Sequence, residues 1–425
     1  MQEYNMVVIG AGPAGMAAAL EAEKNGLTDI VILERDEYIG GILPQCIHNG
    51  FGLEYFGEEL TGPEYAYEFI DELADSNIEV LTETMVLDVD ENKEVTALNK
   101  EKGVLKLKGK TIVLAMGCRE RTRENIRIPG DRPSGILSAG TAQRYTNIEG
   151  YMPGEKVVIL GSGDIGLIMA RRMRLEGADV KAVLEIMPFS SGLVRNKVQC
   201  LDDFDIPLKL QHTITRIEGQ ERLERVRVAQ VDEDFNPIEG TQEWIECDTL
   251  LLSVGLIPEN ELSKAMGLDL HPVTGGTFVN ENRETSIEGV YAAGNVLHVH
   301  DLVDWVSEEA EIAGKAAADY INNNLEKRAQ KIEITPAENV TYTVPQTIEY
   351  TFGDKKFIKV FMRVTEPMED VEVKFSANKE EIISYPKKIV MPGEMVTANL
   401  PAALVTDEME EIKVSIVKKA GENNG

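Results

Sequence analysis

The fold is decided by Tyr4-Asn5-Met6-Val7-Val8-Ile9-Gly10-Ala11-Gly12-Pro13-Ala14-Gly15. The first half of this stretch is a short apolar run of the kind that forms a buried parallel strand. The second half spaces three glycines that allow a tight turn, close approach of a pyrophosphate to the backbone, and close packing of a helix on the strand. We therefore expect a strand, a phosphate-binding turn and a helix in this order.

The residues that follow complete a β-α-β unit. Residues 16–24 are strong helix formers, and Gly26 is expected to end the helix. Residues 29–33 predict a second strand, with Glu34 at its carboxyl end. The unpaired N–H groups at the helix start face phosphate charge, and Glu34 would accept hydrogen bonds from a ribose. The unit therefore predicts a dinucleotide site.

A second unit repeats this plan further along the chain. It comprises a strand at 156–160, the loop Gly161-Ser162-Gly163-Asp164-Ile165-Gly166, a helix at 167–176, Gly177, a strand at 179–184 and Glu185. A carboxylate at Glu185 suits the 2′-hydroxyl of NAD and would repel the 2′-phosphate of NADP. We therefore predict NAD, although Arg195 and Lys197 leave NADP open. Two dinucleotides on one chain predict electron transfer between them.

Composition narrows the class of protein. The chain has 425 residues, enough for two or three domains. Its net charge of −30 argues against binding nucleic acid or an anionic membrane surface. No apolar run approaches the roughly 20 residues of a membrane helix, and the first residues leave no room for a signal peptide. Four scattered cysteines predict a reducing, cytoplasmic location.

The predicted fold class is α/β, with two Rossmann-like dinucleotide-binding domains and a C-terminal all-β domain. Apolar strands at 111–114 and 250–254 end at Gly117 and Gly255, and a helix is expected over 305–322. The second dinucleotide domain is therefore expected to be inserted in the first. The predicted boundaries are 1–117 and 251–328 for the first domain, 118–250 for the inserted domain and 329–425 for the β domain.

The C-terminal region carries alternating apolar and polar residues. Short strands are expected at 341–344, 347–351, 357–364, 371–375 and 412–417. Their spacing predicts a small β-sandwich. An interaction role and a passive appendage remain equally open for it, and residues 421–425 are expected to form a disordered tail.

Residues 1–325 resemble the pyridine-nucleotide-disulfide oxidoreductases, which bind two dinucleotides. The resemblance implies FAD and NAD(H) as cofactors. It assigns to FAD Gly10, Gly12, Pro13, Ala14, Gly15, Glu34, Arg35, Gly41, Gln45, Ala115, Gly117, Gly294, Asn295 and Trp305. It assigns to the nicotinamide cofactor Gly161, Gly163, Asp164, Ile165, Gly166, Glu185 and Gly255.

A narrower resemblance lies in the linker. The segments 116–121, 128–130 and 135–143 resemble those of the FAD subunits of sarcosine oxidase, opine dehydrogenase and hydrogen cyanide synthase. Similar flavoproteins accompany glycerol-3-phosphate dehydrogenase-like partners. This implies that the chain is the electron-transfer subunit of a complex with a second oxidoreductase; a homo-oligomer is also expected.

The chain departs from the family at two positions. Most members have Asp where this chain has Asn295, although an amide can still bond a ribityl hydroxyl. The disulfide enzymes carry two cysteines soon after the glycine pair, whereas Gly40–His48 holds only Cys46. A dithiol relay is therefore excluded for this loop.

Two histidine-containing stretches are candidates for chemistry. Cys46 and His48 lie where the family places its redox centre, and a thiolate there could be redox active or could simply pack near the flavin. Gln45, His48 and Asn49 could instead bond the flavin ring. His298 and His300 share a face in an extended stretch, which favours lining the flavin's pyrimidine edge over binding a metal and leaves a polar loop as the remaining interpretation. A metal is not predicted, because no third ligand has a clear spacing.

The predicted function is hydride transfer between NAD(H) and flavin N5, with electrons passing to or from a partner amine, opine or glycerol-3-phosphate dehydrogenase. Catalysis would depend mainly on positioning, with backbone N–H groups at the start of the Trp305 helix facing the flavin. Two alternatives remain: a self-contained NADH oxidase or peroxidase using Cys46, and a non-catalytic assembly subunit.

Overall fold

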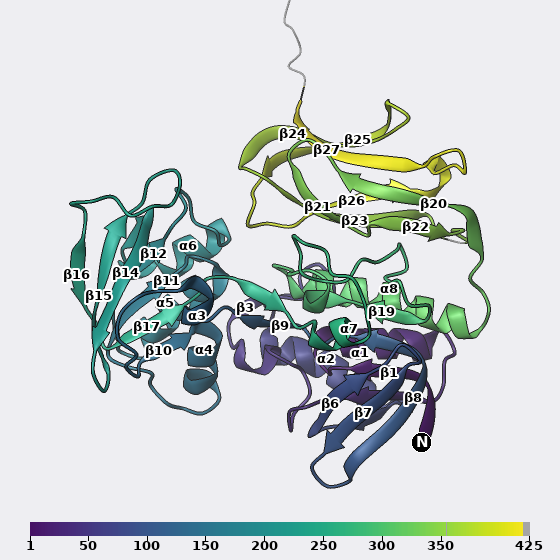
Figure 1. Cartoon of the computed structure of the whole chain (residues 1–425), viewed down its shortest axis with the longest axis horizontal. Helices are drawn as coiled ribbons and strands as arrows, with labels where there is room; N and C mark the ends of the chain where they lie inside the picture. The colour runs from purple at the N-terminus through teal and green to yellow at the C-terminus, as the bar shows by residue number, and fades with distance from the viewer. Residues whose placement is uncertain (354, 420–425) are drawn as a thin grey trace, which may run out of the picture. The chain divides into compact units, whose positions relative to one another are not determined.

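The computed structural model describes residues 1–353 and 355–419. The chain divides into two compact units, one comprising Met1–Cys118 and Pro258–Gly425, the other Arg119–Ile257. Each unit contains a mainly parallel sheet covered by helices (Figure 1). The α/β fold is therefore as predicted, and the boundaries at 117, 250 and 328 remain predictions.

The first unit is built on a seven-stranded sheet. Its strand order is β5-β2-β1-β8-β7-β6, and β19 also pairs with β8. The parallel strands are β1 (Gln2–Ile9), β2 (Ile30–Leu33), β5 (Glu79–Leu81), β8 (Gly103–Leu114) and β19 (Val290–Ala292), and β6 (Thr84–Val89) and β7 (Glu94–Asn99) form an antiparallel extension with the first half of β8. The carboxyl ends of β1 and β2 lead into Gly10 and Glu34, as predicted.

Helices cover this sheet and position the glycine-rich loop. They are α1 (Pro13–Lys24), α2 (Gly62–Ala74), α7 (Glu261–Ala265) and α8 (Val303–Ile321), with the short elements η1 (Leu43–Gln45), β3 (Asn49–Phe51), β4 (Leu60–Thr61) and η3 (Gly294–Val296). A side chain at Gly314 would come within 2.1 Å of the Ala18 carbonyl oxygen, so α8 lies close against α1. This contact lies near the middle of both helices.

The second unit repeats the architecture. Its parallel sheet has the order β10-β17-β11-β12-β13, and a separate antiparallel sheet has the order β14-β15-β16. The strands are β10 (Ile136–Ser138), β11 (Lys156–Leu160), β12 (Asp179–Glu185), β13 (Leu208–Leu210), β14 (His212–Gly219), β15 (Leu223–Gln230), β16 (Glu243–Glu246) and β17 (Thr249–Leu252), and the helices are α3 (Arg123–Ile126), α4 (Ala139–Asn147), α5 (Asp164–Leu175), α6 (Val194–Cys200) and η2 (Asp202–Phe204). The short strands β9 (Cys118–Glu120) and β18 (Leu256–Pro258) lie at the two points where the chain passes between the units.

The C-terminal region forms the expected β domain. One sheet has the order β22-β20-β27-β24-β25 and the other β21-β23-β26. The elements are β20 (Lys327–Pro336), β21 (Val340–Val344), β22 (Thr347–Tyr350), β23 (Phe357–Val364), β24 (Met368–Ala377), β25 (Glu380–Val390), β26 (Val396–Pro401), η4 (Ala402–Leu404) and β27 (Glu411–Lys418). An apolar core that includes Val360, Phe375 and Val414 fills the space between them. The predicted tail at 421–425 lies outside the described residues.

The apolar stretch from Glu79 to Leu87 does not form a single strand. Glu83 adopts a positive φ of 49°, which turns the chain and separates β5 from β6. The first of these strands joins the parallel part of the sheet and the second joins the antiparallel extension. A left-handed residue is uncommon outside glycine, so hydrophobic patterning alone did not reveal the break.

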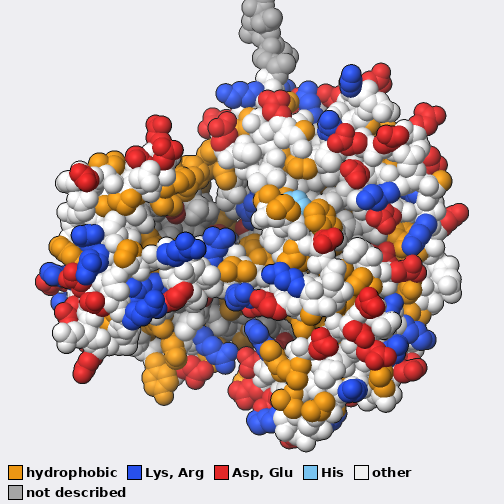
Figure 2. All heavy atoms as spheres, in the orientation of Figure 1, with side chains coloured by type: hydrophobic (Ala, Val, Ile, Leu, Met, Phe, Trp, Pro, Cys, Tyr) orange, Lys and Arg blue, Asp and Glu red, His pale blue; other side chains and the backbone are white. Residues whose placement is uncertain are grey.

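The described residues contain no helix long and apolar enough to cross a membrane. On the face shown in Figure 2, Lys and Arg side chains are interspersed with the more numerous Asp and Glu. This mixed surface agrees with the strongly negative net charge.

Candidate functional site

The first glycine-rich loop is shaped by contacts that leave no room for side chains. Gly10 has a φ of +103°, and a Cβ there would lie 2.5 Å from the Ala115 carbonyl oxygen. A Cβ at Gly15 would lie 1.8 Å from the Gly10 carbonyl oxygen. Both distances are far below a normal contact, so the turn and the close packing of α1 on β1 require glycine.

Glu34 holds the loop from the end of the neighbouring strand. Its side chain is buried, and its Oε2 accepts a hydrogen bond from the Ala11 N–H at 2.8 Å. Its Oε1 accepts from the Asp36 N–H at 2.8 Å. The carboxylate is therefore fixed beside the start of α1, where a ribose is expected.

Two distant segments close over this loop. Gly41 has a φ of +61°, and a Cβ there would lie 3.0 Å from the Gly12 Cα. Gly294 has a φ of +75°, and a Cβ there would lie 3.0 Å from the Ala14 Cβ. Together with the helix start, these backbone surfaces form a cradle that side chains would fill, and the residues present therefore fit the dinucleotide of FAD.

The second loop has the same construction. A Cβ at Gly161 would lie 1.9 Å from the Ser253 carbonyl oxygen, and one at Gly166 would lie 2.4 Å from the Gly161 carbonyl oxygen. Glu185 is buried, and its Oε2 accepts from the Ser162 N–H at 3.0 Å and the Ser162 hydroxyl at 2.6 Å. The residues therefore fit a second dinucleotide, with the carboxylate at the ribose position.

Asp164 distinguishes the second loop from the first. It is the first residue of α5, at the position that Pro13 takes at the start of α1. Its Oδ1 accepts from the Leu193 N–H at 2.9 Å and from the Asn196 Nδ2 at 2.6 Å. Asp164 therefore fastens the segment after β12 to the loop.

The remaining predicted cofactor residues are placed as follows. Pro13 is the first residue of α1, Arg35 is exposed after Glu34, Ile165 is partly exposed in the first turn of α5, and Gly117 and Gly255 take φ values of +70° and +99°. Gly117 and Gly255 each follow the strand that lies next to the glycine loop of their unit, β8 and β17.

Cys46 and His48 lie near Gly41 but are held by different partners. The Cys46 thiol donates to the Ile42 carbonyl oxygen at 3.4 Å, and the Cys46 carbonyl accepts from Gly62 N–H at the start of α2. The His48 Nδ1 lies 3.1 Å from the Asn49 carbonyl oxygen, and its ring contacts Phe51. Gln45, which precedes Cys46, is buried. A catalytic role for this group stays a prediction.

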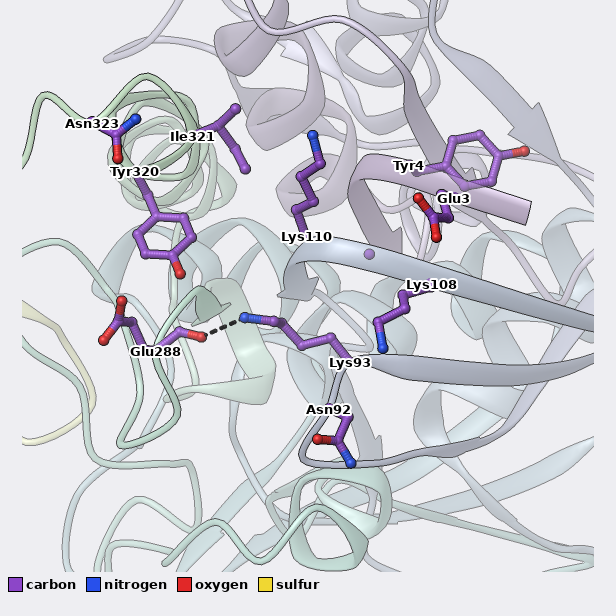
Figure 3. Close-up of a pocket in the computed structure, with 11 residues that line it drawn as sticks. Glu3, Tyr4, Asn92, Lys93, Lys108, Lys110, Glu288, Tyr320, Ile321 and Asn323 are labelled. Atoms are coloured by element: carbon purple, nitrogen blue, oxygen red, sulfur yellow. Dashed lines mark hydrogen bonds between the residues drawn. The ribbon is translucent and has the colours of Figure 1, made fainter. Parts of the chain in front are cut away.

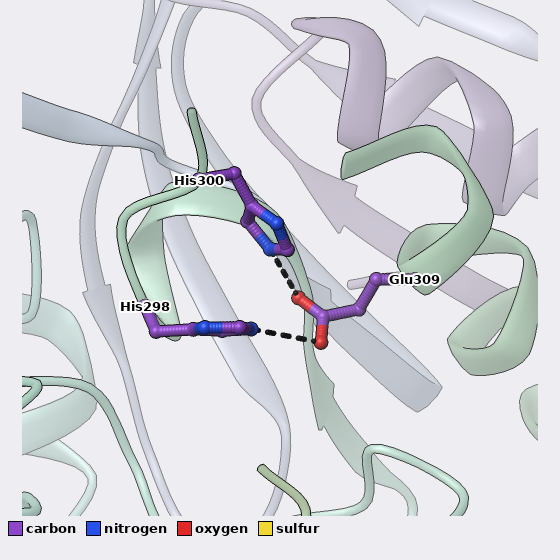
Figure 4. A group of neighbouring side chains, drawn as sticks. All are labelled: His298, His300 and Glu309. Atoms are coloured by element: carbon purple, nitrogen blue, oxygen red, sulfur yellow. Dashed lines mark hydrogen bonds and ion pairs between the residues drawn. The ribbon is translucent and has the colours of Figure 1, made fainter. Parts of the chain in front are cut away.

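His298 and His300 point together, as their spacing predicts, with ring centroids 4.2 Å apart. Their Nε2 atoms lie 3.1 and 3.0 Å from the Oε1 and Oε2 of Glu309 (Figure 4). Both rings also pack against Phe361, at 5.4 Å between centroids. Both rings are therefore buried against α8 and β23, and their expected role at the flavin edge stays a prediction.

The sequence pattern does not reveal Glu309. Besides the two histidines, two further donors bond its carboxylate. Arg283 Nε donates to Oε1 at 2.9 Å, and Gly294 N–H donates to Oε2 at 3.1 Å. The Arg283 and Glu309 side chains are completely buried. No spacing rule connects Glu309 with His298, because α8 and the preceding turn bring them together from different elements. We call Arg283, His298, His300 and Glu309 the Glu309 cluster.

Electrostatics in the Glu309 cluster favour one charged pair. Burial by itself would raise the pKa of Glu309, but His298, Arg283 and His300 lower it well below its usual range. Burial lowers the pKa of His298 to about 4, against the opposing effect of Glu309. At neutral pH, Arg283 and Glu309 are therefore charged, and His298 is neutral and donates through Nε2.

No third ligand has a clear spacing in the sequence, but the fold supplies one: His298, His300 and Glu309 offer ligand atoms within 4.8 Å of one another. Each oxygen of Glu309 nevertheless already accepts two hydrogen bonds from protein donors. The guanidinium of Arg283 also lies beside the carboxylate and repels a cation. The carboxylate is therefore satisfied by protein donors, and the expected absence of a metal stays a prediction.

The start of α8 carries a buried carboxylate. Asp304 accepts from Gly52 N–H at 3.0 Å and Glu54 N–H at 3.4 Å, and burial raises its pKa. The Trp305 ring, expected near the flavin, lies 3.9 Å from the Lys359 Nζ of β23. Trp305 therefore meets the C-terminal β domain.

Asn295 replaces the acid that most family members carry. Its Oδ1 accepts from His300 N–H at 2.9 Å, and its Nδ2 lies 3.6 Å from the Cys118 Sγ. The amide is thus oriented by the protein itself, with its carbonyl toward the turn that leads to His300.

A separate cavity of about 500 Å³ lies at the opposite end of β1 from Gly10 (Figure 3). Glu3, Lys93, Lys108, Lys110 and Tyr320 are among its lining residues. Lys93 Nζ donates to the Glu288 carbonyl oxygen at 2.9 Å. Neither glycine-rich loop lines this cavity, so it is not a dinucleotide site.

Known proteins with a similar sequence or structure are oxidoreductases. A family model described as pyridine nucleotide-disulphide oxidoreductase matches residues 4–319. The HcnB subunit of hydrogen cyanide synthase from Pseudomonas protegens is 26% identical over 74% of this chain and 69% of its own length. An opine oxidase subunit from Agrobacterium tumefaciens is 25% identical over 74% of this chain and 64% of its own.

Two further similar proteins are also oxidoreductases. An NADH oxidase of Methanocaldococcus jannaschii is 26% identical over 70% of this chain and 64% of its own length. This chain thus spans about two thirds of these three relatives. The crystal structure of T. acidophilum thioredoxin reductase shares the fold, with a TM-score of 0.60 and 22% identity over 76% of this chain and 100% of that chain. The chain belongs to the pyridine nucleotide-disulphide oxidoreductase family and is an FAD-dependent NAD(P)H oxidoreductase.

Proposed function

We propose that this chain is the electron-transfer subunit of a complex, exchanging electrons between NAD(H) and a second dehydrogenase of the amine, opine or glycerol-3-phosphate type. The observation that carries the proposal is the loop Gly40–His48, which offers a single cysteine. The Cys46 thiol donates to a backbone carbonyl and has no second cysteine in this loop with which to form a disulfide. The HcnB and opine oxidase relatives are both named as subunits, which supports the same role.

In this proposal, the residues of each unit bind one dinucleotide cofactor and orient it. The loop Gly10–Gly15 and Glu34 would hold the ADP half of FAD, and Gly41 and Gly294 would close over it. The loop Gly161–Gly166 and Glu185 would hold the nicotinamide cofactor. When bound, the two cofactors supply the redox chemistry, in which a hydride passes between nicotinamide and flavin N5. The protein contributes position and exclusion of water.

NAD is the proposed nicotinamide cofactor. The Oε2 of Glu185 accepts from Ser162 and also from the Ser191 hydroxyl at 3.1 Å, and its Oε1 accepts from Met187 N–H at 3.0 Å. These donors fix an ionised carboxylate at the ribose position. A 2′-phosphate there would meet like charge in a partly buried site, which costs affinity.

Acceptor specificity tests the subunit role. With NADH in excess, the purified protein is expected to reduce an artificial dye rapidly but oxygen and hydrogen peroxide only slowly, because neither is its natural acceptor. Cys46→Ser should leave all three rates within about twofold, since a serine hydroxyl can replace the hydrogen bond of the thiol. Rapid peroxide or oxygen turnover that is lost in Cys46→Ser would contradict the proposal.

That contradicting result would support the second candidate, a self-contained NADH oxidase or peroxidase. The position of Cys46 near Gly41 and the likeness to an archaeal NADH oxidase favour this alternative. A purely non-catalytic assembly role gains no such support. A cytoplasmic location and a homo-oligomer also remain proposals; the four cysteines, all within the described residues, form no disulfide, as a reducing compartment would favour.

A further inference from the structure

The C-terminal β domain shares an apolar core with the first dinucleotide-binding sheet. Tyr342, Val344 and Phe361 of β21 and β23 are buried in the cluster that contains Val7 and Ile9 of β1. They do not belong to the core that fills the sandwich itself. The β domain is therefore packed into the first unit and is not an appendage on a tether.

Buried polar contacts reinforce this packing. Glu281 accepts from the Glu349 and Tyr350 N–H groups at 2.9 and 2.8 Å, and the Tyr350 hydroxyl donates to Glu284 at 2.6 Å. Arg363 Nη2 donates to the Asp301 carboxylate and to the Val299 carbonyl, each at 3.1 Å. The last two bonds fasten β23 to the segment that immediately follows Gly294.

Besides Tyr342, whose ring centroid lies 5.9 Å from that of His298, Phe361 is a side chain of the β domain that meets the Glu309 cluster. It is completely buried, with its ring centroid 5.4 Å from each of the His298 and His300 rings. The Arg283 guanidinium lies 5.6 Å from the same ring, and Arg283 Nη2 reaches the Lys359 carbonyl at 3.4 Å. Phe361 and β23 therefore cover the cluster on the side of the β domain.

The other side of the cluster is the turn that closes over the FAD loop. Glu309 accepts from Gly294 N–H, and Gly294 lies against Ala14 at the start of α1. His300 N–H donates to the Asn295 side chain and fixes its orientation. The positions of Gly294 and Asn295 thus depend on His300 and Glu309, which Phe361 in turn keeps in place.

We propose that the C-terminal β domain clamps the FAD-binding turn through the Glu309 cluster, so that retention of FAD depends on Phe361. Phe361, His298, His300 and Glu309 are positioning residues in this account, because they act on FAD through Gly294 and Asn295. The β domain thereby gains a role in cofactor binding within the chain. The proposal rests on the FAD site proposed at Gly10–Gly15.

The test compares two buried phenylalanines of the same domain. Apoprotein is titrated with FAD, and the dissociation constant is read from the quenching of FAD fluorescence. Phe361→Ala is expected to raise this constant about tenfold or more, because the cavity it leaves frees the cluster beneath the turn. Phe375→Ala, in the core of the sandwich, should change it by less than about twofold at a temperature where both variants remain folded by circular dichroism.

A second pair of variants tests the role of the buried Glu309 carboxylate. Glu309→Gln should weaken FAD binding and change the visible circular dichroism of the bound flavin, because the amide presents two donors to a shell that contains only donors. Asp319→Asn, which alters an exposed ion pair on the same helix, should change neither. A spectroscopic change in Glu309→Gln alone cannot arise from a general loss of helix stability.

The possible outcomes distinguish the clamp from the FAD site itself. Equal FAD dissociation constants for Phe361→Ala and Phe375→Ala would overturn the clamp while leaving the FAD site intact. Failure of wild-type apoprotein to bind FAD would overturn both. If Phe361→Ala does not fold, Phe361→Leu and Phe375→Leu make the same comparison with a smaller change in volume, and a larger dissociation constant for Phe361→Leu is again required.

Discussion

The two glycine-rich loops share a backbone and differ in what covers them. In each, the first glycine lies against the carbonyl of a neighbouring strand, and a glutamate accepts from the residue after that glycine. The first loop is covered by Gly41 and Gly294, which come from distant segments. The second is bordered by residues of its own unit, with Asp164 fastening the adjacent segment. If the loops hold the cofactors proposed for them, one motif serves a retained cofactor in the first loop and an exchangeable one in the second, and the segments that cover each loop make the difference.

Matched substitutions in the two loops should have the largest effect. Gly15→Ala places a Cβ 1.8 Å from the Gly10 carbonyl oxygen and should abolish FAD retention, while Gly166→Ala, at 2.4 Å from the Gly161 carbonyl oxygen, should keep FAD but weaken NADH binding about 100-fold. FAD content by absorbance and NADH affinity by titration measure the two losses. Loss of FAD in Gly166→Ala would contradict the assignment of FAD to the first loop and NADH to the second.

Glu185→Gln should have the next largest effect. The amide cannot accept all the bonds that Ser162, Ser191 and Met187 donate, and it removes the charge that repels a 2′-phosphate. NADH affinity should fall about tenfold, and the preference for NADH over NADPH should shrink. Glu34→Gln is the control: it should affect FAD binding and leave that preference unchanged.

The pH dependence of stability should depend on His298. Its pKa in the folded protein is about 4, below its usual value, so the unfolded state binds more protons at intermediate pH. Its contribution is fully present above about pH 6.5 and is lost as the pH falls toward 4, at most about 3 kcal/mol. The acidic pKa of Glu309 acts in the same direction, and Arg283, His300 and Tyr342 are the other ionisable groups facing His298.

Thermal unfolding of the FAD-bound protein between pH 7 and pH 4 measures this dependence. In His298→Asn, the stability should change less steeply with pH than in the wild type, although the variant is less stable than the wild type at pH 7. An equally steep curve in His298→Asn would show that other groups control acid sensitivity. His271, half-buried outside the cluster, provides the control, since His271→Asn should leave most of the slope in place.

Cys46→Ser should have the smallest effect in the set. The rate at which NADH bleaches the flavin absorbance should stay within about twofold of wild type, because the hydroxyl can make the same bond to Ile42. Stopped-flow absorbance under anaerobic conditions measures it. A large fall in this rate would give Cys46, in the segment that follows Gly41, a thiol function in flavin reduction.

Both β-α-β units could be predicted from the sequence because their signals are local. Gly10–Gly15 and Glu34 lie within one supersecondary unit, and α8 was expected over nearly its full length. Strand β20 was missed because it is short of apolar residues, and β26 because it has only six residues and ends at Pro401. Strand β25 was missed because Pro386 and several charges place it at the sheet edge. The formation of such strands depends on pairing with neighbouring strands, which the hydrophobic pattern of one segment does not reveal.

The residues of the candidate site also fall into those that the sequence predicted and those that it did not. The glycines and the two glutamates were found by spacing, whereas Glu309 and Arg283 were not. Their importance comes from meeting in a fully buried cluster, where removing one partner of an ion pair typically costs about 3–5 kcal/mol. Arg123 is likewise buried, and it donates to the Ile128 and Gly130 carbonyls. These contacts are long-range in sequence or depend on loop geometry.

Anaerobic titration of the purified holoprotein with NADH, followed by flavin absorbance, tests the central claim most directly. The account predicts that the bound flavin bleaches stoichiometrically, that NADPH acts more slowly, and that Gly166→Ala keeps its FAD but needs about 100-fold more NADH to bleach. A wild-type protein that binds FAD and remains yellow with excess NADH would contradict the assignment of the two loops to a working pair of cofactors.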